Sequence, residues 1–244
     1  MNRRRRELLM GAVAAGLSAA TGLRPSNRAA GAEPDRTQPG PAKPAQGKTA
    51  EEVSPGEDLM REHGVLKRIL LIYGEVIRRI DAKEGVGSTR PLVDAAGIVR
   101  AFVEDYHEKL EEDFLFPRFK KAGRLVELVD TLAAQHLAGR RLTDTILRLA
   151  TVKFLGVDDS RALAAALGQF IRMYGPHHAR EDTILFPAFH DLVSQREYDA
   201  LGERFEDREN ERFGPNGFEK TVERVAGIEK TLGIYDLAQF TPRG

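Results

Sequence analysis

The chain has 244 residues, an apolar fraction of 41% and a formal net charge of zero, which suits one large domain or one domain with appendages. Because it contains no cysteine, disulfides, zinc–thiolate sites, cysteine-ligated iron–sulfur clusters and cysteine nucleophiles are excluded. The balanced charge provides no basic field of the kind that binds nucleic acid, so we expect no nucleic-acid partner.

The first 32 residues have the organisation of an export signal. Four arginines, Arg3 to Arg6, precede a short run rich in leucine and alanine, and a small-residue cleavage site is available at residues 30–32. The apolar run is short for a membrane span. Residues 5–9 resemble a twin-arginine signal; an ordinary secretory signal and an uncleaved anchor are the alternatives. We therefore expect residues 1–32 to be removed and the protein to be exported to the periplasm, with no stable membrane span after cleavage.

A spacer follows the signal. Residues 33–54 contain several prolines, with glycine, lysine and threonine, and almost no large apolar side chain. Such a composition cannot bury a core and predicts a disordered linker.

From Glu57 onward, apolar residues recur at spacings of three and four, the period of an amphipathic helix. This pattern predicts four long helices at about 57–84, 91–117, 125–154 and 158–193, separated by glycine-containing turns. Pro176 lies inside the fourth, where we expect a kink or a local break.

Four long helices with short connections favour an all-α, up-down-up-down four-helix bundle over residues 55–194. Residues 195–244 form a short helical C-terminal extension, with amphipathic pieces at about 195–210 and 217–232. We expect this extension to pack against the bundle; a lid or a partner contact is the alternative.

The main chemical signal is an internal repeat. Residues 107–117 and 177–187 align without gaps, and both read His-x-x-x-Glu, an acid, two variable positions and then Leu-Phe-Pro. Each copy is preceded by a lone histidine, His63 in the first and His136 in the second. The chain therefore contains two copies of one helix pair.

The spacing within each copy is suited to metal binding. Residues four apart share one helix face, so a single His-x-x-x-Glu is usually a surface ion pair, but two facing copies can converge on metal. Imidazole and carboxylate without thiolate suit iron, manganese or zinc. Glu111 and Glu181 are expected to bridge two metal ions. One ion would be completed by His63 and His107, and the other by His136 and His177.

These residues, over about 57–194, resemble the hemerythrin-like, or HHE cation-binding, family. The resemblance implies a four-helix bundle around a non-haem di-iron site: two iron ions as cofactor, with manganese or zinc as the alternatives. It also implies a small diatomic ligand, O₂ or NO, bound for storage, carriage or sensing. The oxygen-carrying members have a pair of histidines four apart on the third helix; here Arg140 follows His136, so another ligand or an open position must take that place.

Two neighbours of the expected ligands are candidates for that place. Glu108 follows His107, and some family members use the corresponding glutamate as a ligand; His178 follows His177. Neighbouring residues point about 100° apart on a helix, so the alternative is that both face solvent. His190 is expected at the surface. Tyr106 and Tyr174 are expected in the core; the alternative is that their hydroxyls donate hydrogen bonds to the ligands.

Three functions remain open at this point. The first is reversible binding of O₂ or NO; the second is a di-iron oxidoreductase acting on O₂, peroxide or NO; the third is iron storage or iron sensing. Whether the protein is an enzyme, and its oligomeric state, stay open. The His-Glu-x-x-His motif of zinc metalloproteases is absent.

Overall fold

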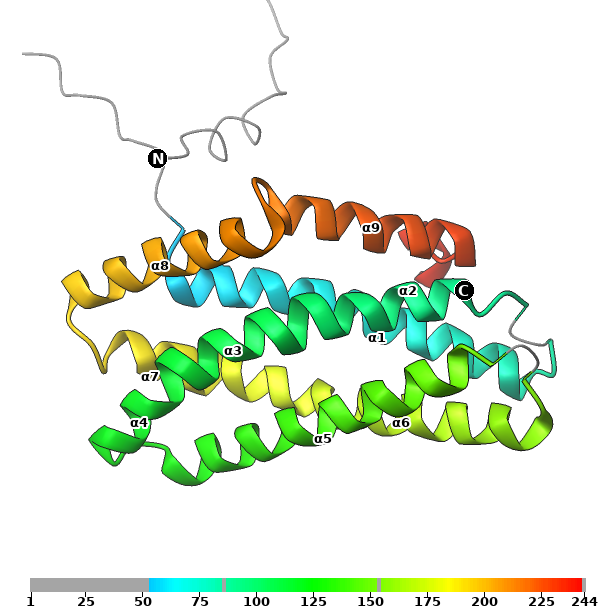
Figure 1. Cartoon of the computed structure of the whole chain (residues 1–244), viewed down its shortest axis with the longest axis horizontal. Helices are drawn as coiled ribbons and strands as arrows, with labels where there is room; N and C mark the ends of the chain where they lie inside the picture. Colours follow the sequence, from blue (N-terminus) through cyan, green and yellow to red (C-terminus); the bar gives the residue numbers. More distant parts are fainter. Residues whose placement is uncertain (1–52, 85–86, 153–154, 243–244) are drawn as a thin grey trace, which may run out of the picture. The chain divides into compact units, whose positions relative to one another are not determined.

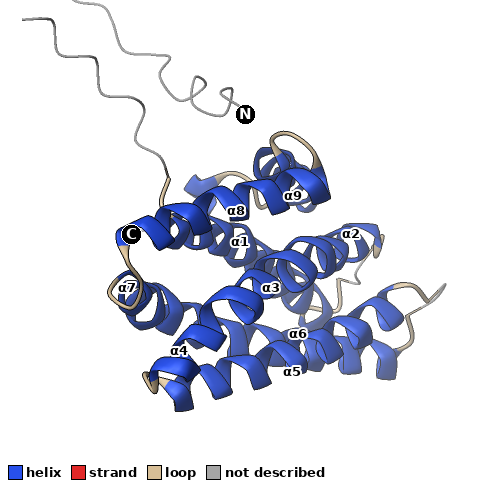
Figure 2. Cartoon of the chain, turned by 60° about the vertical axis from the view of Figure 1, so that its left-hand side comes forward, coloured by secondary structure: helices blue, strands red, loops and turns tan. Residues whose placement is uncertain are grey.

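A computed structural model describes residues 53–84, 87–152 and 155–242. Every regular element within these residues is helical (Figure 2). The expected signal segment and nearly all of the expected linker lie outside the described residues. None of the described helices is long and apolar enough to cross a membrane.

Four long helical rods occupy the positions expected for the bundle. The first is α1 (Pro55–Asp81) and the third is α5 (Val126–Ala150). The second comprises α2 (Arg90–Ile98), η2 (Val99–His107), α3 (Glu108–Leu110), η3 (Glu111–Leu115) and α4 (Phe116–Ala122). The fourth comprises α6 (Val157–Arg180), η4 (Glu181–Leu185) and α7 (Phe186–His190).

Local sequence explains where α1 begins and ends. Its N-cap is Ser54, whose side chain accepts a hydrogen bond from the backbone N–H of Glu57 at 3.3 Å, and Pro55 occupies the first turn, where its missing N–H costs nothing. Arg78 and Arg79 lie in the last turn, where cations interact favourably with the helix dipole.

The rods pack around one core. Contacts join α1 with α6, α6 with α5, α5 with α2, and α2 and η2 with α1, which closes a ring (Figure 1). The interior is filled by aliphatic and aromatic side chains, among them Tyr73, Phe102, Phe170 and Tyr174, each at most 1% exposed. The six expected metal ligands are buried in this interior.

The C-terminal extension forms α8 (Gln195–Phe213), α9 (Gly217–Leu232) and a short 3₁₀ turn, η5 (Leu237–Phe240). Helices α8 and α9 lie along α1 on the side away from α5 (Figures 1 and 2), and α9 also contacts α2. Arg68 on α1 forms an ion pair with the mostly buried Glu229 on α9. The extension therefore packs against the bundle, as expected.

The irregular turns differ from the expectation. We expected a kink or a local break at Pro176; the helix is not broken there, because α6 continues through this residue to Arg180. Wide π-helical turns lie instead at Val99–His107, Glu111–Leu115 and Glu181–Leu185. The last two each end just before the Phe-Pro of the repeat. Proline has no N–H and its ring clashes with the carbonyl four residues earlier, so a wider turn upstream of Pro117 and Pro187 accommodates it. Such π-turns are frequent at functional sites.

Candidate metal centre

The four rods bring the six expected ligands together in the interior. Helix α1 carries His63, the second rod carries His107 and Glu111, α5 carries His136, and the fourth rod carries His177 and Glu181. All six side chains are buried, with exposed fractions from 0 to 4%. Buried ionisable groups are rare unless they are paired or coordinated. Six of them in one place therefore indicate that they pair with one another or coordinate a metal ion.

Each glutamate presents one oxygen to each pair of histidines. Glu111 Oε1 lies 3.9 Å from His107 Nε2, and its Oε2 lies 3.3 Å from His136 Nε2. Glu181 Oε2 lies 3.4 Å from His63 Nε2, and its Oε1 lies 2.9 Å from His177 Nε2. The two carboxylates therefore span the gap between the histidine pairs, as bridging ligands do.

Donor atoms gather in two overlapping groups. One consists of Glu111, His136, His177 and Glu181, and the other of His63, His107 and Glu111; within each group one donor atom per residue lies within 4.8 Å of the others. The histidines are divided as the repeat in the sequence predicts, and Glu111 belongs to both groups, whereas Glu181 belongs to the first group only.

In each of the four histidines expected to be ligands, the other ring nitrogen, Nδ1, contacts a side-chain oxygen. His63 Nδ1 lies 2.6 Å from Asp182 Oδ1, and His136 Nδ1 lies 3.1 Å from Glu112 Oε1. Asp182 and Glu112 each follow a bridging glutamate. His107 Nδ1 lies 2.8 Å from Glu62 Oε2, and His177 Nδ1 lies 2.8 Å from Gln135 Oε1. Glu62 and Gln135 each precede a lone histidine, so the supporting contacts repeat with the ligands.

These contacts fix the tautomers. Carboxylate and amide oxygens accept hydrogen bonds, so each Nδ1 carries the donated proton, and when a ring is neutral the lone pair of its Nε2 points inward. His63 Nε2 and His107 Nε2 then face each other at 3.0 Å. Two lone pairs at that distance repel unless a cation or a proton lies between them. The arrangement fits a metal ion.

The polar atoms of the centre have few other partners. Both oxygens of Glu111, both oxygens of Glu181 and Nε2 of His136 are buried without a hydrogen bond. The short distances therefore join atoms that point toward a common centre rather than atoms that hydrogen-bond to each other. Leaving so many buried polar groups unsatisfied is costly, and metal coordination would satisfy all of them at once.

The protonation of the metal-free centre follows from its burial. Burial raises the pKa of Glu181 to about 8, and burial together with the charge of Glu181 raises the pKa of Glu111. Burial also lowers the pKa of His63, and it lowers that of His177 to about 4. Burial acts against the charged form of His136 too, but the charges of Glu108, Glu111 and Glu112 outweigh it and raise its pKa to about 10.

The two additional candidates are both buried, at 1% exposure for Glu108 and 2% for His178, so the solvent-facing alternative is wrong for both. Glu108 accepts hydrogen bonds from Tyr174 Oη at 2.6 Å and from Arg140 at 2.8 Å. The His178 ring stacks on His63 with centroids 4.3 Å apart, and its Nδ1 has no hydrogen-bond partner. Glu108 does not belong to the two donor groups described above, but it forms a third group with Glu112 and His136, in which one donor atom per residue lies within 4.8 Å of the others. His178 belongs to none of the donor groups found among the described residues. His190 is exposed, as expected.

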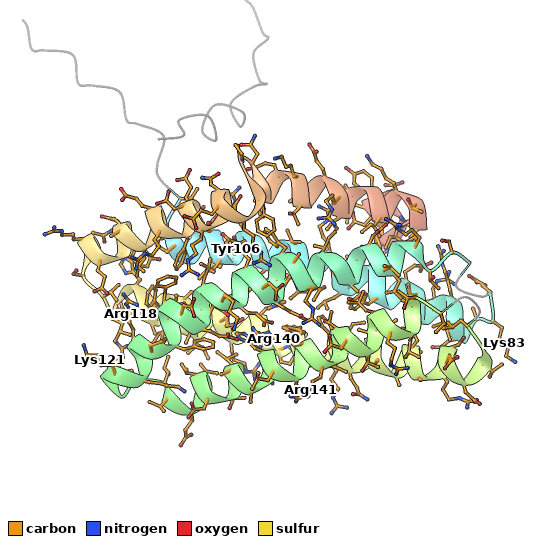
Figure 3. All side chains as sticks on the ribbon, viewed as in Figure 1. Lys83, Tyr106, Arg118, Lys121, Arg140 and Arg141 are labelled. Atoms are coloured by element: carbon orange, nitrogen blue, oxygen red, sulfur yellow. The ribbon has the colours of Figure 1, made fainter. Side chains whose placement is uncertain are left out.

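Arg140 takes the place one turn after His136. Its guanidinium reaches Glu108 at 2.8 Å and Glu112 at 2.7 Å, and Figure 3 shows it between α5 and the second rod, whereas the neighbouring Arg141 points outward. Tyr174 is buried in the core, as expected, and its hydroxyl also donates a hydrogen bond to Glu108, next to the ligand His107. A cation and a phenol thus close the side of the centre where a further histidine would lie.

Gly139 makes room for this network. A Cβ at position 139 would lie 2.0 Å from Tyr174 Oη, and the Tyr174 ring is fully enclosed. We therefore expect Gly139→Ala to displace the phenol, break its bond to Glu108 and lower the free energy of unfolding by about 2 kcal/mol. Gly168→Ala on α6, where nothing lies within 4 Å of the added carbon, should instead raise it by about 0.5 kcal/mol. Urea denaturation of both variants tests this contrast, and equal stabilities would contradict it.

The supporting acceptors Glu62 and Gln135 were not identified from the sequence. A signal existed, because a polar residue directly precedes each lone histidine and an acid follows each bridging glutamate. Glu104, three residues before His107, was also missed. It is buried and contacts Thr143 and Arg100 rather than the centre, and burial raises its pKa to about 7.

Comparison with known proteins agrees with this geometry. The hemerythrin HHE cation-binding domain matches residues 54–154. The uncharacterized proteins Rv1995 of Mycobacterium tuberculosis (strain ATCC 25618 / H37Rv) and Mb2018 of Mycobacterium bovis are each 50% identical to the chain over 192 residues, which cover 78% of this chain and 74% of each relative. No solved structure matches the chain significantly. The chain belongs to the hemerythrin HHE cation-binding domain family.

Proposed function

We propose that the protein is a non-haem di-iron protein that binds a small diatomic ligand, O₂ or NO, for storage, carriage or sensing. The observation that carries the proposal is the convergence of four histidine Nε2 atoms and two glutamates whose oxygens lack hydrogen bonds. In the proposed arrangement the rods form an up-down-up-down bundle. His63 and His107 bind one iron, His136 and His177 bind the other, and Glu111 and Glu181 bridge the two irons.

Iron is favoured by the donor set. Four imidazoles and two carboxylates without a thiolate suit iron, manganese or zinc, and a pair of ions bridged by carboxylates in a bundle core suits iron redox chemistry. The supporting acceptors Asp182, Glu112, Glu62 and Gln135 would orient the rings and increase their basicity. In this arrangement each iron has two histidines and two bridging carboxylates as protein ligands, which leaves room for an exogenous ligand in an octahedral shell.

An oxygen cycle tests the proposed function. The full chain is loaded anaerobically with Fe(II), exposed to O₂ and then degassed while its visible spectrum is recorded. Reversible binding predicts a band that develops with O₂ and disappears on degassing, and nitric oxide should give its own reversible band. A single irreversible oxidation would reject reversible oxygen binding.

The second candidate is a di-iron oxidoreductase acting on O₂, peroxide or NO. Arg140 favours it, because a cation, with Glu108 and Tyr174, stands where the oxygen-carrying relatives place a histidine. A fixed cation stabilises negative charge that develops beside it in a dry site. Loss of added peroxide or NO over many turnovers would support this candidate, whereas weak, exchangeable iron would support iron storage or sensing instead.

Arg140→His separates these candidates. The substitution restores a pair of histidines four apart on α5, so we expect oxygen binding to become more reversible than in the wild type, measured as the fraction of the visible band lost on degassing. Arg141→His, at the exposed neighbouring position, is the control and should behave like the wild type. A wild type and an Arg140→His variant with the same reversibility would show that Arg140 does not decide the outcome.

We also propose that residues 1–32 direct export to the periplasm and are then removed. Sequencing the mature N-terminus from envelope and periplasmic fractions tests this. A chain that retains Met1 in every fraction would contradict cleavage.

A further inference from the structure

His178 is a buried imidazole next to the metal centre, and the six expected ligands leave it without a role. It follows His177 on α6 and is only 2% exposed. Its Nδ1 has no hydrogen-bond partner among the described residues. Unsatisfied buried polar groups are costly and uncommon, so this nitrogen is available to a partner that comes from outside the chain.

The ring of His178 is positioned by other rings. It stacks on the ring of His63, with centroids 4.3 Å apart and planes 26° apart, and its centroid lies 5.6 Å from that of Tyr174. His63 Nε2 lies 3.4 Å from Glu181 Oε2 and 3.0 Å from His107 Nε2, the atoms that would surround a metal ion. A ring stacked face to face on His63 therefore lies beside the metal position, within reach of a small molecule bound there.

The other copy of the repeat has its corresponding side chain fully bonded. Glu108 is the residue aligned with His178, and both of its carboxylate oxygens accept hydrogen bonds, Oε1 from Tyr174 Oη at 2.6 Å and Oε2 from Arg140 at 2.8 Å. These bonds close that side of the centre with groups of the chain itself. A buried residue at this position is therefore readily satisfied within the fold, and the unbonded nitrogen of His178 is a difference between two halves that otherwise repeat.

The basic residue one turn after each lone histidine accounts for the difference. In one half this residue is Arg140, which reaches Glu108. In the other half it is Lys67, whose ion pair is with Asp182, at 2.8 Å. The carboxylate is thus bonded to a cation of the chain, whereas the imidazole of His178 does not attract a cation and keeps its Nδ1 free.

We propose that His178 donates a hydrogen bond from Nδ1 to the exogenous ligand of the metal centre. The inference rests on the proposed function and deepens it, because it assigns a residue that holds the ligand without binding the metal. A neutral imidazole carries its hydrogen on either nitrogen, and no partner among the described residues occupies Nδ1. A ligand whose outer atom carries negative charge would gain a charge-assisted hydrogen bond in this buried place. His178 would therefore favour small ligands that have an outer acceptor atom, as O₂, NO and azide have.

Azide binding tests the proposal on the full chain. Protein loaded with iron and oxidised to the ferric state is titrated with sodium azide, and the charge-transfer band of the azide complex gives Kd. His178→Phe retains a ring that can stack on His63 but has no N–H. We expect it to bind azide about 10–100-fold more weakly while retaining the iron content of the wild type. His178→Gln, which retains an N–H donor, should recover part of the affinity, and His190→Phe, at an exposed position, should bind azide like the wild type.

The infrared stretch of bound azide reports on the hydrogen bond directly. Exchange of H₂O for D₂O should shift this stretch in the wild type but not in His178→Phe. If His178→Phe does not fold, His178→Leu replaces it in both measurements.

Four results would overturn the proposal while leaving the proposed function standing. These are an unchanged azide affinity in the folded variant, equal weakening in His178→Phe and His178→Gln, no isotope shift in the wild type, and loss of iron from both variants, which would make His178 a metal ligand. A wild type without stoichiometric iron would instead reject the proposed function, and this proposal with it.

Discussion

Replacing Glu181 with glutamine is expected to strip the metal centre while leaving the fold intact. Glu181 presents one oxygen to His63 and the other to His177, so an amide at this position removes a ligand from both metal sites. Loss of a residue that merely orients a ligand already costs about 10–100-fold in metal affinity, and loss of a bridging ligand should cost about 100-fold or more. Metal analysis after dialysis against a weak chelator measures the effect.

The same substitution should not destabilise the metal-free protein. Burial raises the pKa of Glu181 to about 8, so near neutral pH a neutral glutamine resembles the protonated carboxyl that the metal-free interior already contains. Thermal unfolding of the two metal-free proteins at pH 7 should therefore agree closely. Glu211→Gln, which lies far from the ligands in sequence and is exposed, should retain both metal and stability. Full metal content in Glu181→Gln would exclude Glu181 as a ligand.

Metal-free protein is expected to lose stability as the pH rises from 6.5 to 8. The folded pKa of Glu181, about 8, lies above its ordinary value of 4.5, so the folded state holds a proton that the unfolded state has released. The folded pKa of His136, about 10, lies above its ordinary 6.5, with the same sign. Stability therefore falls as pH rises in this window, by about 2–3 kcal/mol for the two groups together.

The histidines with lowered pKa values affect the stability of the metal-free protein below pH 6.5. His177, with a pKa of about 4, and His63 are neutral in the folded state and become charged more readily in the unfolded state below pH 6.5. Their contribution is lost as the pH falls from 6.5 toward 4. The metal-free protein should consequently be most stable near pH 6.

Bound metal should reverse the trend above pH 6.5, because ligands must lose their protons to coordinate and affinity therefore rises with pH. Urea denaturation at pH 6.5 and at pH 8, with and without a chelator, measures the stability of the metal-free and of the metal-bound protein. Between pH 6.5 and 8, the free energy of unfolding of metal-free Glu181→Gln should fall less than that of the metal-free wild type. A metal-free wild type as stable at pH 8 as at pH 6.5 would contradict the assignment of raised pKa values to this centre.

The sequence predicted the parts of the site that follow from helical periodicity. His107 and Glu111 are four residues apart, so any helix places them on one face, and the second copy repeats this at His177 and Glu181. The lone histidines could be added because the repeat aligns them. All four elements were expected as helices, and they were found within a few residues of the expected limits.

Other parts depend on contacts between rods, which a single sequence does not specify. Nothing within α5 indicates that Arg140 reaches Glu108, or that Tyr174 from α6 meets the same carboxylate. The local break expected at Pro176 does not occur, and the irregular turn begins after Arg180 instead, because the sequence alone did not show which proline the helix could accommodate. The stacking of His178 on His63 likewise depends on where α6 packs.

The central claim is that the chain holds two metal ions between its four rods. The most direct test is to load the full chain with Fe(II), remove loosely bound metal, and measure iron per chain together with iron K-edge X-ray absorption. The account predicts two irons per chain, a first shell of nitrogen and oxygen, and scattering from a second iron. Absence of stoichiometric iron, or single isolated irons without a second iron nearby, would contradict it.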